Sequence, residues 1–101
     1  MQTITLIHLE HSNVQQEAQR IAKRLVNHWK HKFQIEQLNE YQQTIHMPDA
    51  SIRLQALDNG LHVTIETQDK DIAELERVVL DHLNRMAQQE FQVEWQRQDQ
   101  V

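Results

Sequence analysis

Histidine is the residue type in this sequence with the greatest capacity for chemistry. The chain has seven histidines and no cysteine, so disulfides, thiolate metal sites and cysteine nucleophiles are excluded. Two of the histidines, His28 and His31, lie three residues apart around Trp29 in the stretch NHWKHK at 27–32. This spacing is compatible with two interpretations, a ligand site and the basic end of an amphipathic helix.

The positions of the histidines on two predicted helices decide which of them could meet. At about 100° per residue, His82 lies about 50° from the middle of the second apolar stripe. His28 lies about 70° from the middle of the first stripe, whereas Trp29 lies near its centre. His31 points about 130° away and is expected to be exposed. If the helices lie side by side on a sheet, we expect His28 and His82 to approach each other.

A pairing of His28 with His82 would form either a metal site or part of the core. Neutral imidazoles in a partly apolar cleft bind zinc or iron and serve as axial ligands to haem. His31 or Glu90 would supply a third ligand at a helix end. Alternatively, each histidine of the pair is hydrogen-bonded to a carbonyl or to a carboxylate such as Glu90. No strong metal pattern such as HExxH is present, so both interpretations stay open.

A second polar group, formed by His46, Arg53 and Glu66, falls on predicted strands. The predicted strand pairings place all three in one row on the outward face of the sheet. A base, a cation and a carboxylate could perform acid–base chemistry. A solvated face with cross-strand ion pairs is the simpler interpretation, because a flat face does not exclude water.

Several other functions lack support in the composition. The single glycine excludes Gly-rich phosphate loops, and no serine lies in a G-x-S-x-G motif, so an enzyme is not the favoured interpretation. A formal charge of −5 argues against a nucleic-acid partner. The first ten residues lack the features of a signal peptide, and no apolar run approaches the ~18 residues of a membrane span. We therefore expect a cytoplasmic protein with no membrane partner.

Apolar periodicity predicts the elements that position these residues. Helical spacing indicates helices over about 13–31, with Ser12 and Gln15 as a capping box, and over about 71–88, with Asp71 as the cap. Strand-like segments occur at six places, over 3–9, 33–35, 45–47, 52–56, 61–65 and 91–95.

The turns between the middle strands predict their register. The Asn-Gly pair at 59–60 indicates a two-residue hairpin turn, which would pair Arg53 with Glu66. The loop at 48–50 would then pair His46 with Arg53, and the two registers agree in placing apolar residues on one face.

The order β-α-β-β-β-β-α-β predicts an α+β two-layer sandwich, with two helices packed on one face of a largely antiparallel sheet. A chain of 101 residues, 39% hydrophobic and 25% charged, fits one globular domain over 1–101. We expect 96–101 to form a polar tail.

Two motifs resemble those of a small bacterial family catalogued as domain of unknown function 2218. They are HWKHKF at 28–33 and VVLDHLNRMAQQEFQVEW at 78–95. Members of that family resemble one another in a His-Trp-x-His-Lys helix end and in a Val-Val-x-x-His-Leu-x-Arg segment that leads through a glutamate to a tryptophan. The matching residues here are His28, Trp29, His31, Lys32, Val78, Val79, His82, Leu83, Arg85, Glu90 and Trp95.

The resemblance implies no established activity, but it points to His28, His31 and His82, and similar domains are associated with iron-, siderophore- or haem-handling neighbours. The chain departs from the family pattern at Met86, where an aromatic residue is expected, and at Gln89, where an arginine is expected.

From these observations we expect a small cytoplasmic binding or accessory protein that handles iron or haem through His28 and His82. The ligand would lie at the end of the first helix against Trp29 and Trp95, with His31 secondary. The alternative is an interaction module without a cofactor, which forms a homodimer through a sheet edge or face or binds an unknown protein partner. An acid–base enzyme on the sheet face is a third interpretation.

Overall fold

The computed structural model describes residues 1–68 and 71–98. Helices and strands follow one another as the sequence predicts, with two helices among six strands. Their bounds are β1 (Gln2–His8), α1 (Val14–Trp29), β2 (Gln34–Asn39), β3 (Gln42–His46), β4 (Ala50–Leu57), β5 (Gly60–Thr67), α2 (Ile72–Ala87) and β6 (Gln96–Gln98). No helix within the described ranges is long and apolar enough to cross a membrane.

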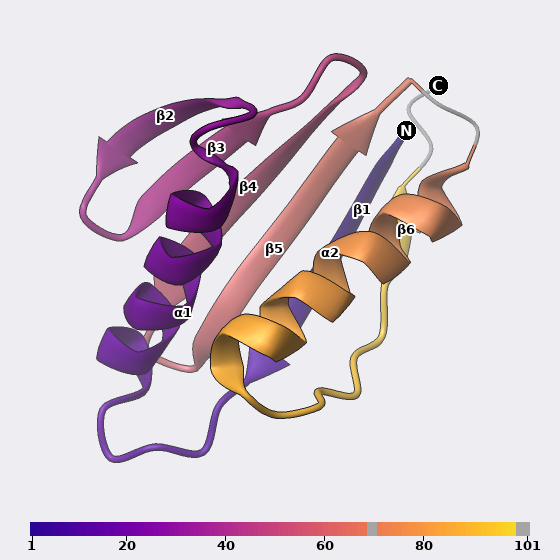
Figure 1. The fold of residues 1–101 in the computed structure, drawn as a ribbon. Coiled ribbons are helices and arrows are strands. Elements are labelled where there is room, and N and C mark those ends of the chain that lie inside the picture. The colour runs from indigo at the N-terminus through magenta and orange to yellow at the C-terminus, as the bar shows by residue number, and fades with distance from the viewer. Residues whose placement is uncertain (69–70, 99–101) are drawn as a thin grey trace.

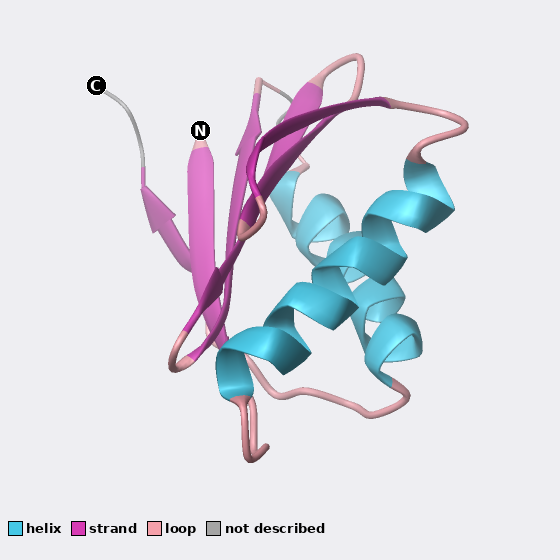
Figure 2. Cartoon of the chain, turned by 90° about the vertical axis from the view of Figure 1, so that its left-hand side faces the viewer, coloured by secondary structure: helices cyan, strands magenta, loops and turns pink. Residues whose placement is uncertain are grey.

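Both helices cover the same face of one antiparallel sheet. The strands lie in the order β2-β3-β4-β5-β1-β6 (Figure 1), and every neighbouring pair is antiparallel. Seen from the side, the helices form one layer and the strands a second, and no helix of the described residues covers the outer face of the sheet (Figure 2). This arrangement confirms the predicted α+β two-layer class.

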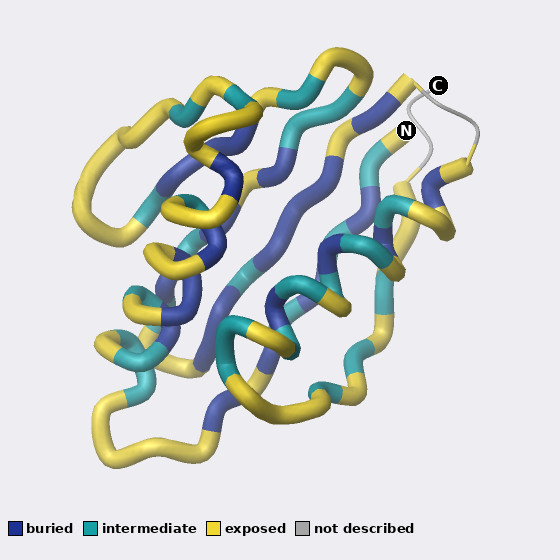
Figure 3. Tube along the Cα trace, viewed as in Figure 1, coloured by how far each residue is buried: buried dark blue, intermediate teal, exposed yellow. Residues whose placement is uncertain are grey.

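The hydrophobic core fills the space between the two layers. Every second residue of the central strands points towards the helices, and each helix contributes one buried stripe (Figure 3). Full burial of a leucine, isoleucine or valine side chain contributes roughly 1.5–3 kcal/mol. The largest fully buried apolar side chains are Ile7, Ile21, Leu25, Ile45, Ile52, Leu54, Leu61, Val63, Ile65, Val79 and Leu83.

The hairpin turn between β4 and β5 lies one residue earlier than predicted. Leu57 pairs with Gly60, so the two turn residues occupy 58–59 rather than 59–60. Gly60 has a φ of 149°, and a Cβ at this position would overlap the carbonyl oxygen of Ile7 in β1. The glycine is therefore required for the close approach of two strands rather than for the turn.

The predicted register is wrong by two residues on both sides of β4, because the turn before β4 also lies one residue earlier than predicted. Arg53 lies opposite Thr64 instead of Glu66, and His46 lies opposite Ser51 instead of Arg53. Because a shift of two residues preserves the face on which each side chain lies, apolar residues still meet apolar residues in the core.

The helix starts agree only partly with the predicted caps. Asp71 caps α2 as predicted, and its side chain accepts a hydrogen bond of 3.2 Å from the Glu74 amide. The cap of α1 is Asn13 rather than Ser12. The Asn13 side chain accepts from the Gln16 amide at 3.2 Å, and asparagine is at least as good an N-cap as serine.

The last strand follows the predicted one instead of coinciding with it. Residues 91–95 are irregular, although their apolar side chains pack partly buried against the core. The Thr5 hydroxyl donates to the carbonyl of Glu94 at 2.9 Å, and only the following residues, Gln96–Gln98, pair with β1. These residues belong to the predicted polar tail, and 99–101 lie outside the described residues.

A buried carboxylate on α2 ties this last strand to the rest of the fold. Glu76 is 6% exposed, and it accepts hydrogen bonds from the Thr3 hydroxyl at 2.7 Å and from Nη2 of Arg97 at 2.8 Å. Burial raises the pKa of Glu76, but the hydrogen bonds from Arg97 and Thr3 and the positive charge of Arg97 together lower it more, so the pKa lies below its ordinary value of 4.5. The carboxylate is therefore charged in the folded protein at neutral pH.

We expect the Glu76 carboxylate to make folding depend on acidity. Because its pKa is lowered by folding, its contribution is fully present above the ordinary value of 4.5 and is lost as the pH falls through the lower pKa of the folded protein. A Glu76→Gln variant should lose about 1–3 kcal/mol of the free energy of unfolding at neutral pH, and its stability should fall less steeply in acid. Urea unfolding over a pH series measures both effects.

Glu74→Gln is the matched control, because Glu74 lies on the same helix and pairs with Arg77 but is largely exposed. An equal loss of stability in both variants, or the same acid dependence in Glu76→Gln as in the unmodified chain, would contradict a role for the buried carboxylate.

Candidate functional site

The two helices run in opposite directions and bring the histidines to the same level. Nη1 of Arg24 donates to the carbonyl of Met86 at 2.9 Å, which fixes α1 against α2. His28 lies one turn after Arg24, and His82 lies one turn before Met86. The two imidazole rings accordingly meet across the helix pair, with their centroids 5.5 Å apart and their planes tilted by 47°.

Trp29 forms the apolar wall of this histidine pair. Its ring lies 4.8 Å from the ring of His82 and, in an edge-on contact, 6.0 Å from that of Phe33. Trp29 is 6% exposed, whereas His28 is exposed and His82 is half-buried. The pair therefore has a packed indole on one side and solvent on the other.

A backbone hydrogen bond fixes the proton on His82. Its Nδ1 lies 2.7 Å from the carbonyl oxygen of Val78. Since a carbonyl only accepts, Nδ1 donates, and the neutral ring then carries its lone pair on Nε2. This bond satisfies one of the two ring nitrogens, as expected for a structural histidine. It is also the contact that orients many metal-binding histidines.

The other two residues considered as metal ligands do not join the pair. His31 lies in the turn after α1, Glu90 lies in the segment after α2, and both are exposed. Across residues 1–68 and 71–98, no hydrogen bond, ion pair or ring contact joins either of them to the histidine pair, and no group of three ligating side chains could hold a metal ion. Of the four residues considered as metal ligands, only His28 and His82 are therefore brought together.

Trp95 lies elsewhere in the fold, near the edge of the sheet that is formed by β6. The preceding residue, Glu94, is held by Thr5 of β1, and the next residue begins β6 at the sheet edge. Helix α1 instead covers β3, β4 and β5 (Figure 1). Of the six residues considered, the structure brings together His28, Trp29 and His82.

The row predicted on the outer sheet face is absent, because the register differs by two residues. His46 lies next to Glu36 of β2, with Nε2 and Oε1 2.9 Å apart. Arg53 lies in the neighbouring row, opposite Thr64, whereas Glu66 lies opposite Ser51. The three groups proposed for acid–base chemistry are therefore not aligned.

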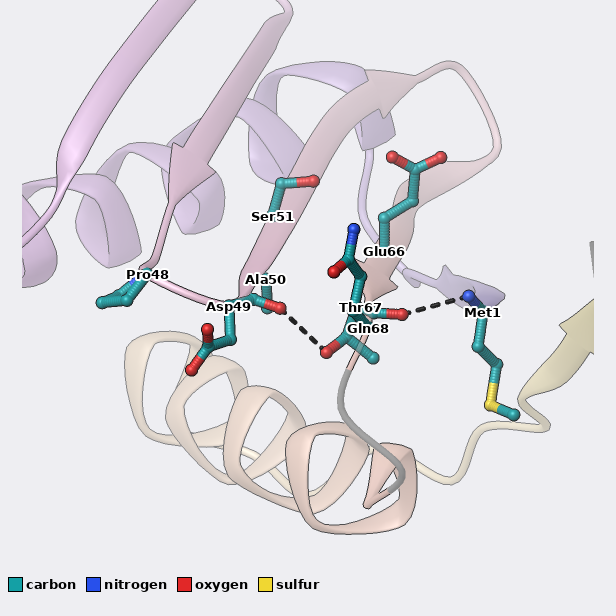
Figure 4. Close-up of a pocket in the computed structure, with 8 residues that line it drawn as sticks. All are labelled: Met1, Pro48, Asp49, Ala50, Ser51, Glu66, Thr67 and Gln68. Carbon is teal, nitrogen blue, oxygen red and sulfur yellow. Dashed lines mark hydrogen bonds between the residues drawn. The ribbon is translucent and has the colours of Figure 1, made fainter.

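Two cavities of the described chain lie apart from the histidine pair. One, of about 370 Å³, opens where β4 begins and β5 ends (Figure 4). Two hydrogen bonds of 3.0 Å connect the residues at its rim. The Met1 nitrogen donates to the Thr67 carbonyl, and the Thr67 hydroxyl donates to the Asp49 carbonyl. The other, of about 530 Å³, lies between α1 and the β2–β3 hairpin. Neither is lined by His28 or His82, so neither cavity supplies the partly apolar cleft in which a metal-binding histidine pair was expected to lie.

Comparison with known proteins agrees with the motifs and with the fold. Residues 12–96 match the model of a family described as an uncharacterized protein conserved in bacteria (DUF2218), and the chain belongs to this family. The fold is similar to the NMR structure of PA4090 from Pseudomonas aeruginosa, with 29% identity, a TM-score of 0.69 and 94% of each chain covered. No curated protein matches the sequence. The predicted family is therefore confirmed.

Proposed function

We propose that the protein is a small cytoplasmic binding protein that holds a transition-metal ion, or a small metal complex, between His28 and His82. The observation that carries the proposal is the distance of 5.5 Å between the two imidazole rings, together with the lone pair that the Val78 contact leaves on Nε2 of His82.

The ring separation fits two histidines that share one metal ion. A metal about 2.0–2.1 Å from an imidazole nitrogen lies about 3.2 Å from the ring centre. Two such rings around a tetrahedral ion have centres about 5.2 Å apart, whereas two rings on opposite sides of an ion have centres about 6.4 Å apart. The observed 5.5 Å is closer to the tetrahedral arrangement. It therefore favours an ion or a small chelate over haem held by two axial histidines.

Two protein ligands leave at least two coordination positions open. Imidazole nitrogen suits zinc, copper, iron and nickel, and iron, as an ion or in a small chelate, is among these metals. The open positions would be filled by water or by a molecule that arrives with the metal. Trp29 supports this role, because its packing against His82 holds the ring in place before the metal binds.

An interaction module is the second candidate, and one feature of the structure favours it. Strand β2 forms an edge of the sheet and is mostly exposed. Leu38 in this strand is 55% exposed, and Tyr41 in the following turn is 37% exposed. An unpaired edge with exposed apolar side chains can pair with the same edge of a second copy.

The metal proposal predicts saturable binding of one metal per chain. We expect Zn(II) and anaerobic Fe(II), titrated separately into tag-free protein, to bind one to one, and we expect His28→Ala and His82→Ala each to weaken binding at least about tenfold. Haem, titrated in parallel by absorbance, should bind more weakly or not at all. Calorimetry gives the stoichiometry and affinity of the metal ions.

His31→Ala is the matched control, because this histidine is close in sequence but lies outside the pair. Equal weakening by all three substitutions would indicate nonspecific binding by surface histidines, and unchanged affinity in His82→Ala would refute the site.

The interaction module predicts a dimer that depends on the β2 edge. Light scattering coupled to size-exclusion chromatography would show twice the chain mass at a protein concentration of about 100 μM, and Leu38→Lys should convert the dimer to monomer. Lys32→Glu, outside β2, serves as a control for a change of surface charge. A monomer at this concentration would count against the module.

A further inference from the structure

The larger of the two cavities lies between α1 and the β2–β3 hairpin, and neither His28 nor His82 lines it. Its volume of about 530 Å³ is within the range of small-molecule sites. Helix α1 supplies one wall and the hairpin supplies the other. The lining residues that matter for binding are Arg20, Lys23, Val26, Gln37, Glu40 and Gln43.

The inner wall of the cavity contains a buried amide oxygen that has no hydrogen-bond partner among the described residues. Gln43 lies in β3 and is only 7% exposed. Its Oε1 is fully buried and accepts no hydrogen bond from any described residue. A buried acceptor left without a donor costs about 1–3 kcal/mol. An apolar side chain would avoid this cost at a position that faces α1, two residues before the fully buried Ile45.

The free acceptor of Gln43 therefore points to an occupant that donates a hydrogen bond. Because the last torsion of a glutamine side chain is soft, the amide can turn its oxygen towards such an occupant without moving the strand. A ligand N–H or O–H would then satisfy the only side-chain atom of the described residues that is buried and unpaired.

The charges around the cavity define the rest of the ligand. Arg20 is already paired with Glu17 on its own helix. Lys23 makes no ion pair with any residue in 1–68 or 71–98, so its ammonium is available to an anionic group. Glu40, on the opposite wall, accepts a hydrogen bond from the Tyr41 hydroxyl, and its carboxylate has further lone pairs for a cationic group. Opposite charges on opposite walls match a molecule with charges of both signs.

We infer that this cavity binds a small zwitterionic amide of the size of a di- or tripeptide. Its amide N–H donates to Oε1 of Gln43, its carboxylate contacts Lys23, and its ammonium group contacts Glu40. Val26 offers an apolar surface to a short side chain. This site shares no residue with the histidine pair, so it stands whether or not the pair binds metal.

The test compares alanyl-alanine with its ester analogue, alanyl-lactate, in which oxygen replaces the amide N–H. Amide chemical shifts of the labelled protein are followed during each titration. The unmodified chain should bind alanyl-alanine about tenfold more tightly than the ester, because only the amide donates to Gln43. In Gln43→Leu the two probes should bind equally, and thermal unfolding should show that this variant is at least as stable as the unmodified chain.

A second variant tests the charge of the site without altering its buried wall. Lys23 is exposed, so Lys23→Gln should fold normally and bind alanyl-alanine several-fold more weakly. It should bind the C-terminally amidated probe as well as the unmodified chain does, because that probe has no carboxylate. Lys30→Gln, outside the cavity, should change neither titration.

Two results would overturn the inference. One is the absence of saturable shifts at cavity residues with alanyl-alanine at up to about 20 mM, since weaker binding would not distinguish a site from surface contact. The other is equal affinity of the unmodified chain for the amide and for the ester. A preference for the amide over the ester that disappears in Gln43→Leu, together with weaker binding of alanyl-alanine by Lys23→Gln, would establish the site.

Discussion

The burial of one sheet face under two helices is the constraint on which the other features depend. Because α1 and α2 share that face, their side chains meet along a line, and His28 and His82 lie on it. The sheet is wider than the helix layer, since α1 covers β3, β4 and β5 while β2 extends beyond it. The cavity between α1 and the β2–β3 hairpin lies at this part of the sheet. Both candidate sites therefore arise from the same packing arrangement, one between the helices and one beside them.

Local periodicity accounts for what could be predicted from the sequence. Apolar spacing gave both helices and the order of the elements, and helical angles were enough to bring His28 and His82 together. The face of the sheet on which each strand residue lies was also predicted correctly in spite of the error in register, because a shift of two residues leaves every side chain on its own face. The register of β4 with β5 was wrong because the only glycine serves the contact between β1 and β5, and that contact joins residues far apart in the sequence.

Features that depend on distant partners could not be predicted in this way. The alternation over 91–95 resembles a strand, but hydrogen bonding to β1 begins only at Gln96. Glu76 lies on the buried stripe of α2, and a charged residue at such a position indicates an internal ion pair. Its partner could not be predicted, because Arg97 lies in the segment 96–101, which was expected to be a polar tail. Gln43 is likewise a polar residue on a buried face, two positions before the core residue Ile45. The cavity that it lines could be recognised only once the position of α1 opposite β3 was known.

The contact between Glu76 and Arg97 has a further consequence for the protein in a crowded solution. Strand β1 is rich in β-branched and apolar residues, a composition that favours pairing with other extended chains. Among the described residues, the edge of β1 that faces away from β5 pairs with three residues, those of β6. Because the ion pair ties Arg97 in β6 to Glu76 in α2, it favours the state in which this edge of β1 is paired, and this opposes pairing of β1 with other extended chains.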